Sequence, residues 1–71
     1  MTKEMFLEKM ADIMDLEDAV TMETELKDME EWDSLSIVGY VAFANASLGK
    51  TIPPAVVRTA ETIEDLYNLL K

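Results

Sequence analysis

Residues 34–49 carry no charged side chain, although charged residues make up 30% of this chain. The apolar residues recur at helical spacing, but they extend nearly all the way round the helix instead of forming a single stripe. One stripe, at spacings of four, three and four, is enough to face a core and consists of Ile37, Val41, Ala44 and Leu48, with Tyr40 at its edge. A second stripe, on the same side as Ser34, consists of Leu35, Val38 and Ala42. The second stripe is either buried in a helical bundle or exposed as a docking strip for a partner protein.

Helical patterns also flank this stretch, so the chain is predicted to be all-α. Thr2 can cap a first helix over residues 3–14, in which Phe6, Met10 and Ile13 face inward with Leu7 and Met14 beside them. Residues 15–33 mix apolar and acidic side chains without a sustained period, which indicates an ordered loop with at most a helical turn. The apolar residues of this loop are expected to close one end of the core.

Two signals end the second helix and separate it from two shorter helical segments. Gly49 is a good helix stop, and the residues before Pro53 and Pro54 avoid the helical conformation. A short segment over residues 55–58 precedes a last helix over residues 62–70. Thr62 and Asp65 approximate a capping box for it. Its inward stripe consists of Ile63, Leu66, Leu69 and Leu70.

The size and composition of the chain exclude several classes of protein. Its 71 residues suffice for a single domain, residues 1–71, without a deep active-site cleft. The chain has no cysteine and no histidine, so disulfides, thiolate nucleophiles and the commonest general base are excluded, and we expect no enzyme. No segment approaches the roughly 20 apolar residues of a membrane span, and no signal-peptide pattern is present. We therefore expect a cytoplasmic protein without a membrane span.

The net charge of −9 is concentrated in one segment. Residues 12–33 hold ten acidic residues and one basic residue, Lys27, whereas the rest of the chain is balanced. Because no basic patch is present, nucleic-acid binding is excluded. The segment is either a solvated loop or a surface for a basic partner. It lacks the glycine and the ligand alternation of an EF-hand, so no metal site is predicted.

Ser34 stands where the acidic segment meets the charge-free helix. Ser and Asp are both preferred at helix N-caps, where the side-chain oxygen accepts a backbone N–H and contributes about 1 kcal/mol. Alternatively, Ser34 carries a phosphate ester, since a helix N-terminus favours an anion. With no histidine to activate it, Ser34 is better explained as an attachment point than as a nucleophile.

The tripeptide Asp33, Ser34 and Leu35 resembles the motif that opens the second helix of the acyl carrier proteins. The resemblance continues through the apolar helix to an Ile-Pro turn, Ile52 and Pro53, which begins 18 residues after Ser34. It then extends through the short segment and the last helix, and so covers almost the whole chain. The combination of motif, turn and chain length is more specific than the tripeptide alone.

This resemblance implies a small four-helix bundle of the acyl-carrier type, with a short third helix. It implies that a phosphopantetheinyl transferase attaches 4′-phosphopantetheine from coenzyme A to the Ser34 hydroxyl, and that acyl or aminoacyl groups are held on the arm as thioesters. Asp33 would help to present Ser34 to the transferase, whose metal ion favours a nearby carboxylate. An acyl-loading ligase or synthase and downstream acyl-using enzymes would be further partners of this monomeric carrier.

The second helix departs from the family. Typical carriers of fatty-acid synthesis have acidic residues along it, whereas the matching positions here are Ser36, Gly39, Asn45 and Ala46. This favours a specialised pathway over primary fatty-acid synthesis, with Leu35, Val38 and Ala42 as the partner contacts. Trp32 either anchors the same interface or packs the loop onto the core. The alternative from another functional class is an acidic helical protein-interaction module without a cofactor.

Carriers of this family can also enclose the acyl chain between their helices. The residues that would line such a pocket here are apolar, and two are small enough to leave room: Ala44, Ile52, Val56, Ala60, Ile63 and Leu66. The flexible side chains of Met10 and Met14 can adapt to a guest. Ordinary core packing explains the same residues without a guest.

Overall fold

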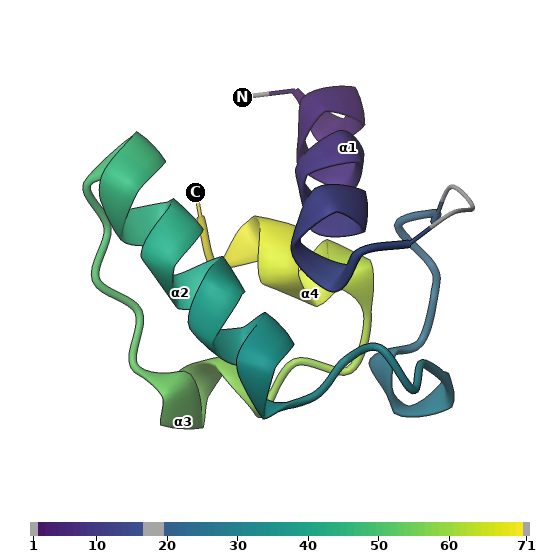
Figure 1. Ribbon diagram of the computed structural model, residues 1–71. Helices are drawn as coiled ribbons and strands as arrows, with labels where there is room; N and C mark the ends of the chain where they lie inside the picture. Colours follow the sequence, from purple (N-terminus) through teal and green to yellow (C-terminus); the bar gives the residue numbers. More distant parts are fainter. Residues whose placement is uncertain (1, 17–19, 71) are drawn as a thin grey trace.

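The computed structural model describes residues 2–16 and 20–70, and its regular elements are helical (Figure 1). The four α-helices are α1 (Lys3–Met14), α2 (Ser34–Leu48), α3 (Pro54–Val57) and α4 (Ile63–Asn68), and a 3-10 turn, η1, spans Leu26–Asp28. No strand occurs among these residues. Glu25 and Thr62 form an isolated antiparallel β-bridge. The prediction of an all-α chain with a short third helix is confirmed. Both α1 and α3 pack against α2, and Figure 1 shows α3 near the N-terminal end of α2.

The helix boundaries follow the capping residues in the sequence. The Thr2 side chain accepts a hydrogen bond from the Met5 N–H at 3.1 Å and begins α1. Gly49, with φ of 65°, adopts the left-handed conformation that ends α2. Thr62 and Asp65 form the complete capping box of α4, in which each side chain accepts from the other residue's backbone N–H. These predicted starts and stops are confirmed.

The core takes residues from every helix and from the acidic loop. Its buried members are Phe6, Met10, Met14, Met22, Leu26, Ile37, Tyr40, Ala44, Ile52, Val57, Ile63, Leu66 and Leu70. On α1 the prediction needs one correction, because Met14 is buried whereas Ile13 is only half-buried. Ile13 lies against Gly39, where an added Cβ would stand 3.0 Å from the Ile13 Cγ2 atom. Gly39 therefore allows α1 to approach α2 closely.

Tyr40 is the largest fully buried side chain, although its spacing predicted only an edge position. The hydroxyl donates a hydrogen bond to the Leu66 carbonyl oxygen at 2.6 Å and so joins α2 to α4. Val41 and Leu48, which were predicted to face the core, are half-buried. The inward face of α2 is thus centred on Ile37, Tyr40 and Ala44.

The acidic loop is tied to the start of α4 by backbone hydrogen bonds. The Ile63 N–H donates to the Thr24 carbonyl at 3.1 Å, and the Glu64 N–H donates to the Met22 carbonyl at 2.9 Å. These two donors belong to the first turn of α4, where a helix offers no acceptor of its own. The prediction of an ordered loop with a helical turn is confirmed for residues 20–33, while Glu17 and Asp18 of the acidic segment lie outside the described residues.

None of the helices within residues 2–16 and 20–70 has the length and apolar character that crossing a bilayer requires.

We predict that Tyr40→Phe lowers the free energy of unfolding by about 1–3 kcal/mol, because it leaves the buried Leu66 carbonyl without its donor. Urea denaturation at pH 7, followed by circular dichroism, measures this loss. Equal midpoints for the two proteins would show that the hydrogen bond contributes nothing to stability.

The free energy of unfolding of Tyr40→Phe should also depend less on alkaline pH than that of the wild type. Burial raises the pKa of the Tyr40 hydroxyl above its ordinary value, so the folded chain holds this proton more tightly than the unfolded chain does. The stability that results is present below about pH 10, the ordinary pKa at which the unfolded tyrosine is half ionised, and is lost as the pH rises further. The free energy of unfolding should therefore fall less steeply between pH 9 and 11, roughly the range of tyrosine ionisation, in Tyr40→Phe than in the wild type.

Candidate functional site

Asp33, and not Ser34, is the N-cap of α2. The Asp33 backbone is extended, and its Oδ1 atom accepts a hydrogen bond from the Ser36 N–H at 3.0 Å. Ser34 is the first residue of the helix itself. The interpretation of Ser34 as the capping residue is therefore wrong, because the acid one position earlier already accepts the N–H group that a cap would satisfy.

The Ser34 side chain is consequently left accessible. Ser34 is exposed, and no hydrogen bond joins its hydroxyl to another residue in the part of the chain that the structure describes. The hydroxyl sits at the N-terminus of the 15-residue helix α2, where the helix dipole and the free N–H groups favour a negatively charged group. Ser34 can thus accept a phosphate without first breaking an interaction with the rest of the site.

Ser36 is part of this site, and its role was not predicted from the sequence. Its side chain is only 5% exposed, and its hydroxyl donates a hydrogen bond to the Glu31 carbonyl oxygen at 2.5 Å. A signal for this burial was present, because Ser36 precedes Tyr40 by four residues and so shares its face of the helix.

Trp32 packs against the core rather than standing free. It is half-buried, and its ring meets Tyr40 edge to face, with centroids 6.4 Å apart and an interplanar angle of 77°. The loop-packing interpretation of Trp32 therefore agrees with the structure. A contact between Trp32 and a partner stays a prediction.

The second apolar stripe of α2 is exposed. Leu35 is 79% exposed, Val38 is 60% exposed, and Ala42 also faces solvent. Val56 of α3, the helix that packs against α2, adds a further exposed aliphatic side chain. Of the two interpretations left open by the sequence, burial of this stripe is excluded within the single chain.

The candidates for an acyl pocket divide into three groups. Ala44, Ile63 and Leu66 are fully buried and Ile52 nearly so, whereas Ala60 is half-buried. Val56 was expected to line the interior, but it is exposed and the neighbouring Val57 is buried in its place. The correction has a simple cause, because α3 is a single turn and directs only part of its surface inward.

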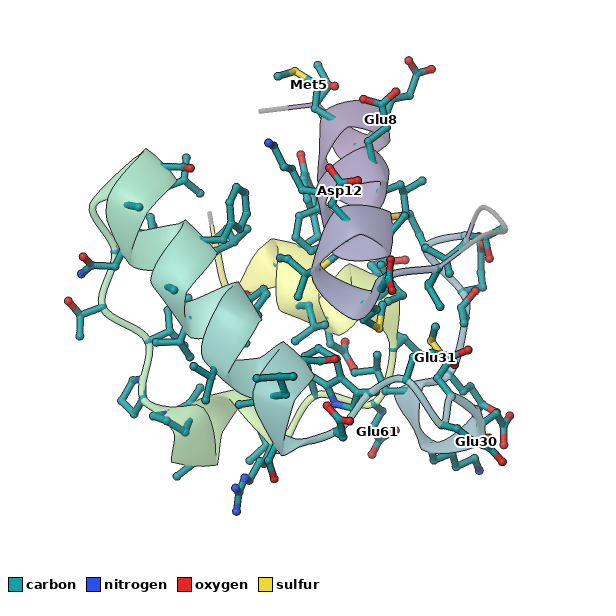
Figure 2. All side chains as sticks on the ribbon, viewed as in Figure 1. Met5, Glu8, Asp12, Glu30, Glu31 and Glu61 are labelled. Carbon is teal, nitrogen blue, oxygen red and sulfur yellow. The ribbon has the colours of Figure 1, made fainter. Side chains whose placement is uncertain are left out.

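Exposed acidic side chains lie on several parts of the surface, including α1, the loop before α2 and Glu61 before α4 (Figure 2). Glu8 and Asp12 project from α1 beside the exposed Met5, and Glu30 and Glu31 project from the loop before α2. Within residues 2–16 and 20–70, no group of three or more acidic side chains is arranged to hold a metal ion.

Comparison of the chain with family models, curated proteins and solved structures finds no match.

Substitution can separate the effect of the Asp33 capping oxygen on the stability of α2 from the effect of its negative charge. Asp33→Ala should lower the free energy of unfolding by about 1 kcal/mol because α2 loses its cap, whereas Asp33→Asn should keep the cap and nearly all of the stability. Chemical denaturation of both variants measures the difference. A loss in Asp33→Asn as large as that in Asp33→Ala would show that the charge, and not the capping oxygen, is what stabilises the helix.

Proposed function

We propose that this chain is a carrier protein whose Ser34 holds a 4′-phosphopantetheine arm. The observation that carries the proposal is the division of roles in the tripeptide Asp33, Ser34 and Leu35. Asp33 caps the helix, the Ser34 hydroxyl is exposed and free of hydrogen bonds to the described residues, and Leu35 is exposed beside it. Four helices with a short third one are also what the resemblance to acyl carrier proteins implies. On this proposal the helices pack as a bundle of that type.

In the attachment step, the Ser34 oxygen forms a bond to the phosphorus atom of coenzyme A that bears the pantetheine. The pyrophosphate bond breaks, the adenosine bisphosphate half leaves, and the hydroxyl proton passes to a base of the transferase. The N-terminus of α2 then lies beside the phosphate and stabilises its charge. One carboxylate oxygen of Asp33 caps the helix, and the other is available to the metal ion of the transferase.

Once the arm is attached, its terminal thiol holds the cargo as a thioester. The chain contains no cysteine and no histidine, so the cofactor supplies the reactive group and partner enzymes supply the catalysis. The carrier acts as a monomer in the cytoplasm, between a loading ligase or synthase and downstream acyl-using enzymes. Acyl and aminoacyl groups both suit this chemistry.

The exposed strip on α2 is the proposed docking surface for these enzymes. Leu35, Val38 and Ala42 lie on one side of a helix without a charged residue, so the partner surface that fits them is apolar. Burial of each large aliphatic side chain contributes roughly 1.5–3 kcal/mol before the cost of ordering it. An apolar strip in place of acidic residues favours a specialised pathway over primary fatty-acid synthesis.

Attachment is tested by intact mass. After incubation with coenzyme A and a promiscuous phosphopantetheinyl transferase, the wild type should gain one phosphopantetheine and Ser34→Ala should gain none. Ser47→Ala, which removes an exposed hydroxyl near the other end of α2, is the matched control and should be modified fully. A wild type that gains no mass would favour the cofactor-free interaction module, and modification at another residue would also refute the proposal.

Docking is tested with two kinds of charge change. Val38→Asp should slow loading of the arm by the cognate enzyme at unchanged stability, whereas Ser47→Asp, at an exposed position of the same helix, should not. Because the strip is uncharged, the loading rate should change little across a salt series or in the double variant Glu30→Gln, Glu31→Gln. A rate that collapses in the double variant and tolerates Val38→Asp would show that docking is electrostatic.

A further inference from the structure

Ser36 bonds to the residues that precede Ser34 through both its side chain and its backbone. Its hydroxyl donates to the Glu31 carbonyl at 2.5 Å, and its N–H donates to the Asp33 carboxylate at 3.0 Å. The Glu31 carbonyl also accepts the Asp33 N–H at 3.1 Å. These three hydrogen bonds connect Glu31, Asp33 and Ser36, and the unbonded Ser34 hydroxyl lies on the chain between the last two.

The turn held in this way is also fixed to the core. Trp32 lies between Glu31 and Asp33, and its ring rests edge to face on Tyr40. The Tyr40 hydroxyl in turn bonds to the Leu66 carbonyl of α4. Two interactions therefore determine the direction in which the chain enters α2. They are the ring contact between Trp32 and Tyr40 and the hydrogen bond from Tyr40 to α4.

The bond from the Ser36 hydroxyl is not needed to cap the helix. Asp33 already accepts the hydrogen bond from the Ser36 N–H at this end of α2. The Glu31 carbonyl, which accepts from the Ser36 hydroxyl, lies two residues before the cap. What the bond adds is a constraint on the segment before the helix. A nearly buried hydroxyl is also a poor target for modification, since Ser36 is 5% exposed whereas Ser34 faces solvent.

We infer that Ser36 is a positioning residue for the modification of Ser34. This inference rests on the proposed function. The Ser36 hydroxyl holds residues 31–33 in the one arrangement in which Asp33 and the Ser34 hydroxyl are presented together to the transferase. A chain that lacks this bond spends part of its time in other arrangements, which raises the concentration of carrier that the transferase requires without changing the chemical step.

The test is the steady-state kinetics of phosphopantetheine transfer with Ser36→Ala as the substrate. We expect the KM for the carrier to rise about two- to tenfold, the range that one net hydrogen bond supports, with kcat unchanged. Ser36→Thr keeps the hydroxyl and should restore a low KM. If Ser36→Ala fails to fold, Ser36→Cys keeps nearly the same volume with a weaker donor and should raise KM in the same direction.

Thr2→Ala is the matched control, because it removes a helix-capping hydroxyl at the N-terminal end of α1, which lies away from the N-terminal end of α2 (Figure 1). It should lower the melting temperature and leave KM unchanged. A wild-type KM in Ser36→Ala, or an equal rise in Thr2→Ala, would overturn the positioning role while the modification of Ser34 still stood. A wild type that takes no phosphopantetheine would instead refute the proposed function.

Trp32 gives a second readout that does not depend on the transferase. It is the single tryptophan of the chain, so its fluorescence reports on this turn alone. Time-resolved anisotropy should show faster local motion of Trp32 in Ser36→Ala than in the wild type or in Thr2→Ala. Identical anisotropy decays in all three proteins would show that the Ser36 hydroxyl does not hold the turn.

Discussion

The orientation of α2 depends on Tyr40. The helix has two apolar stripes and no charge, so hydrophobic burial alone does not decide which stripe faces the core. Tyr40 decides it, because it brings the largest fully buried side chain of the protein and a hydroxyl that reaches the Leu66 carbonyl. Gly39 favours the same orientation, since its missing Cβ makes room for Ile13 of α1.

This choice of face fixes the surface as well as the interior. With Tyr40 inward, Ser36 is buried four residues before it, and its hydroxyl needs the Glu31 carbonyl as an acceptor. Leu35 and Val38 then face solvent on the side of Ser34. The same rotation of one helix thus buries the Ser36 hydroxyl and exposes both the Ser34 hydroxyl and the apolar strip.

The local features of the fold could be predicted from the sequence, and the features that depend on packing could not. Thr2, Gly49 and the Thr62–Asp65 pair act within one helical turn of their own positions, so their residue types suffice to place helix ends. The roles of Tyr40 and Ser36 depend on carbonyl groups 26 and 5 residues away, which periodicity does not reveal.

The candidate site shows the same division. Its location at Asp33 and Ser34 follows from the tripeptide, but the assignment of the cap to Asp33 required the backbone geometry. Val56 was expected inside as a candidate for the acyl pocket, but Val57 is buried in its place, and a one-turn helix is too short for a period to distinguish the two. Ile13 and Met14 were also misjudged, since they are adjacent near the inward face of α1 and helical periodicity does not resolve which of the two is buried.

The hydrogen bonds between the acidic loop and α4 have a consequence for how the chain folds. A helix of six residues is too short to persist alone in water, and the first N–H groups of α4 find their acceptors in Met22 and Thr24, some forty positions earlier in the chain. The last helix is therefore stabilised by the backbone of residues 22–24, which lie in the most highly charged part of the molecule. Residues 22–26 are consequently as much a part of the folded framework as α4 itself, and a substitution that disturbs their backbone should also destabilise the last helix.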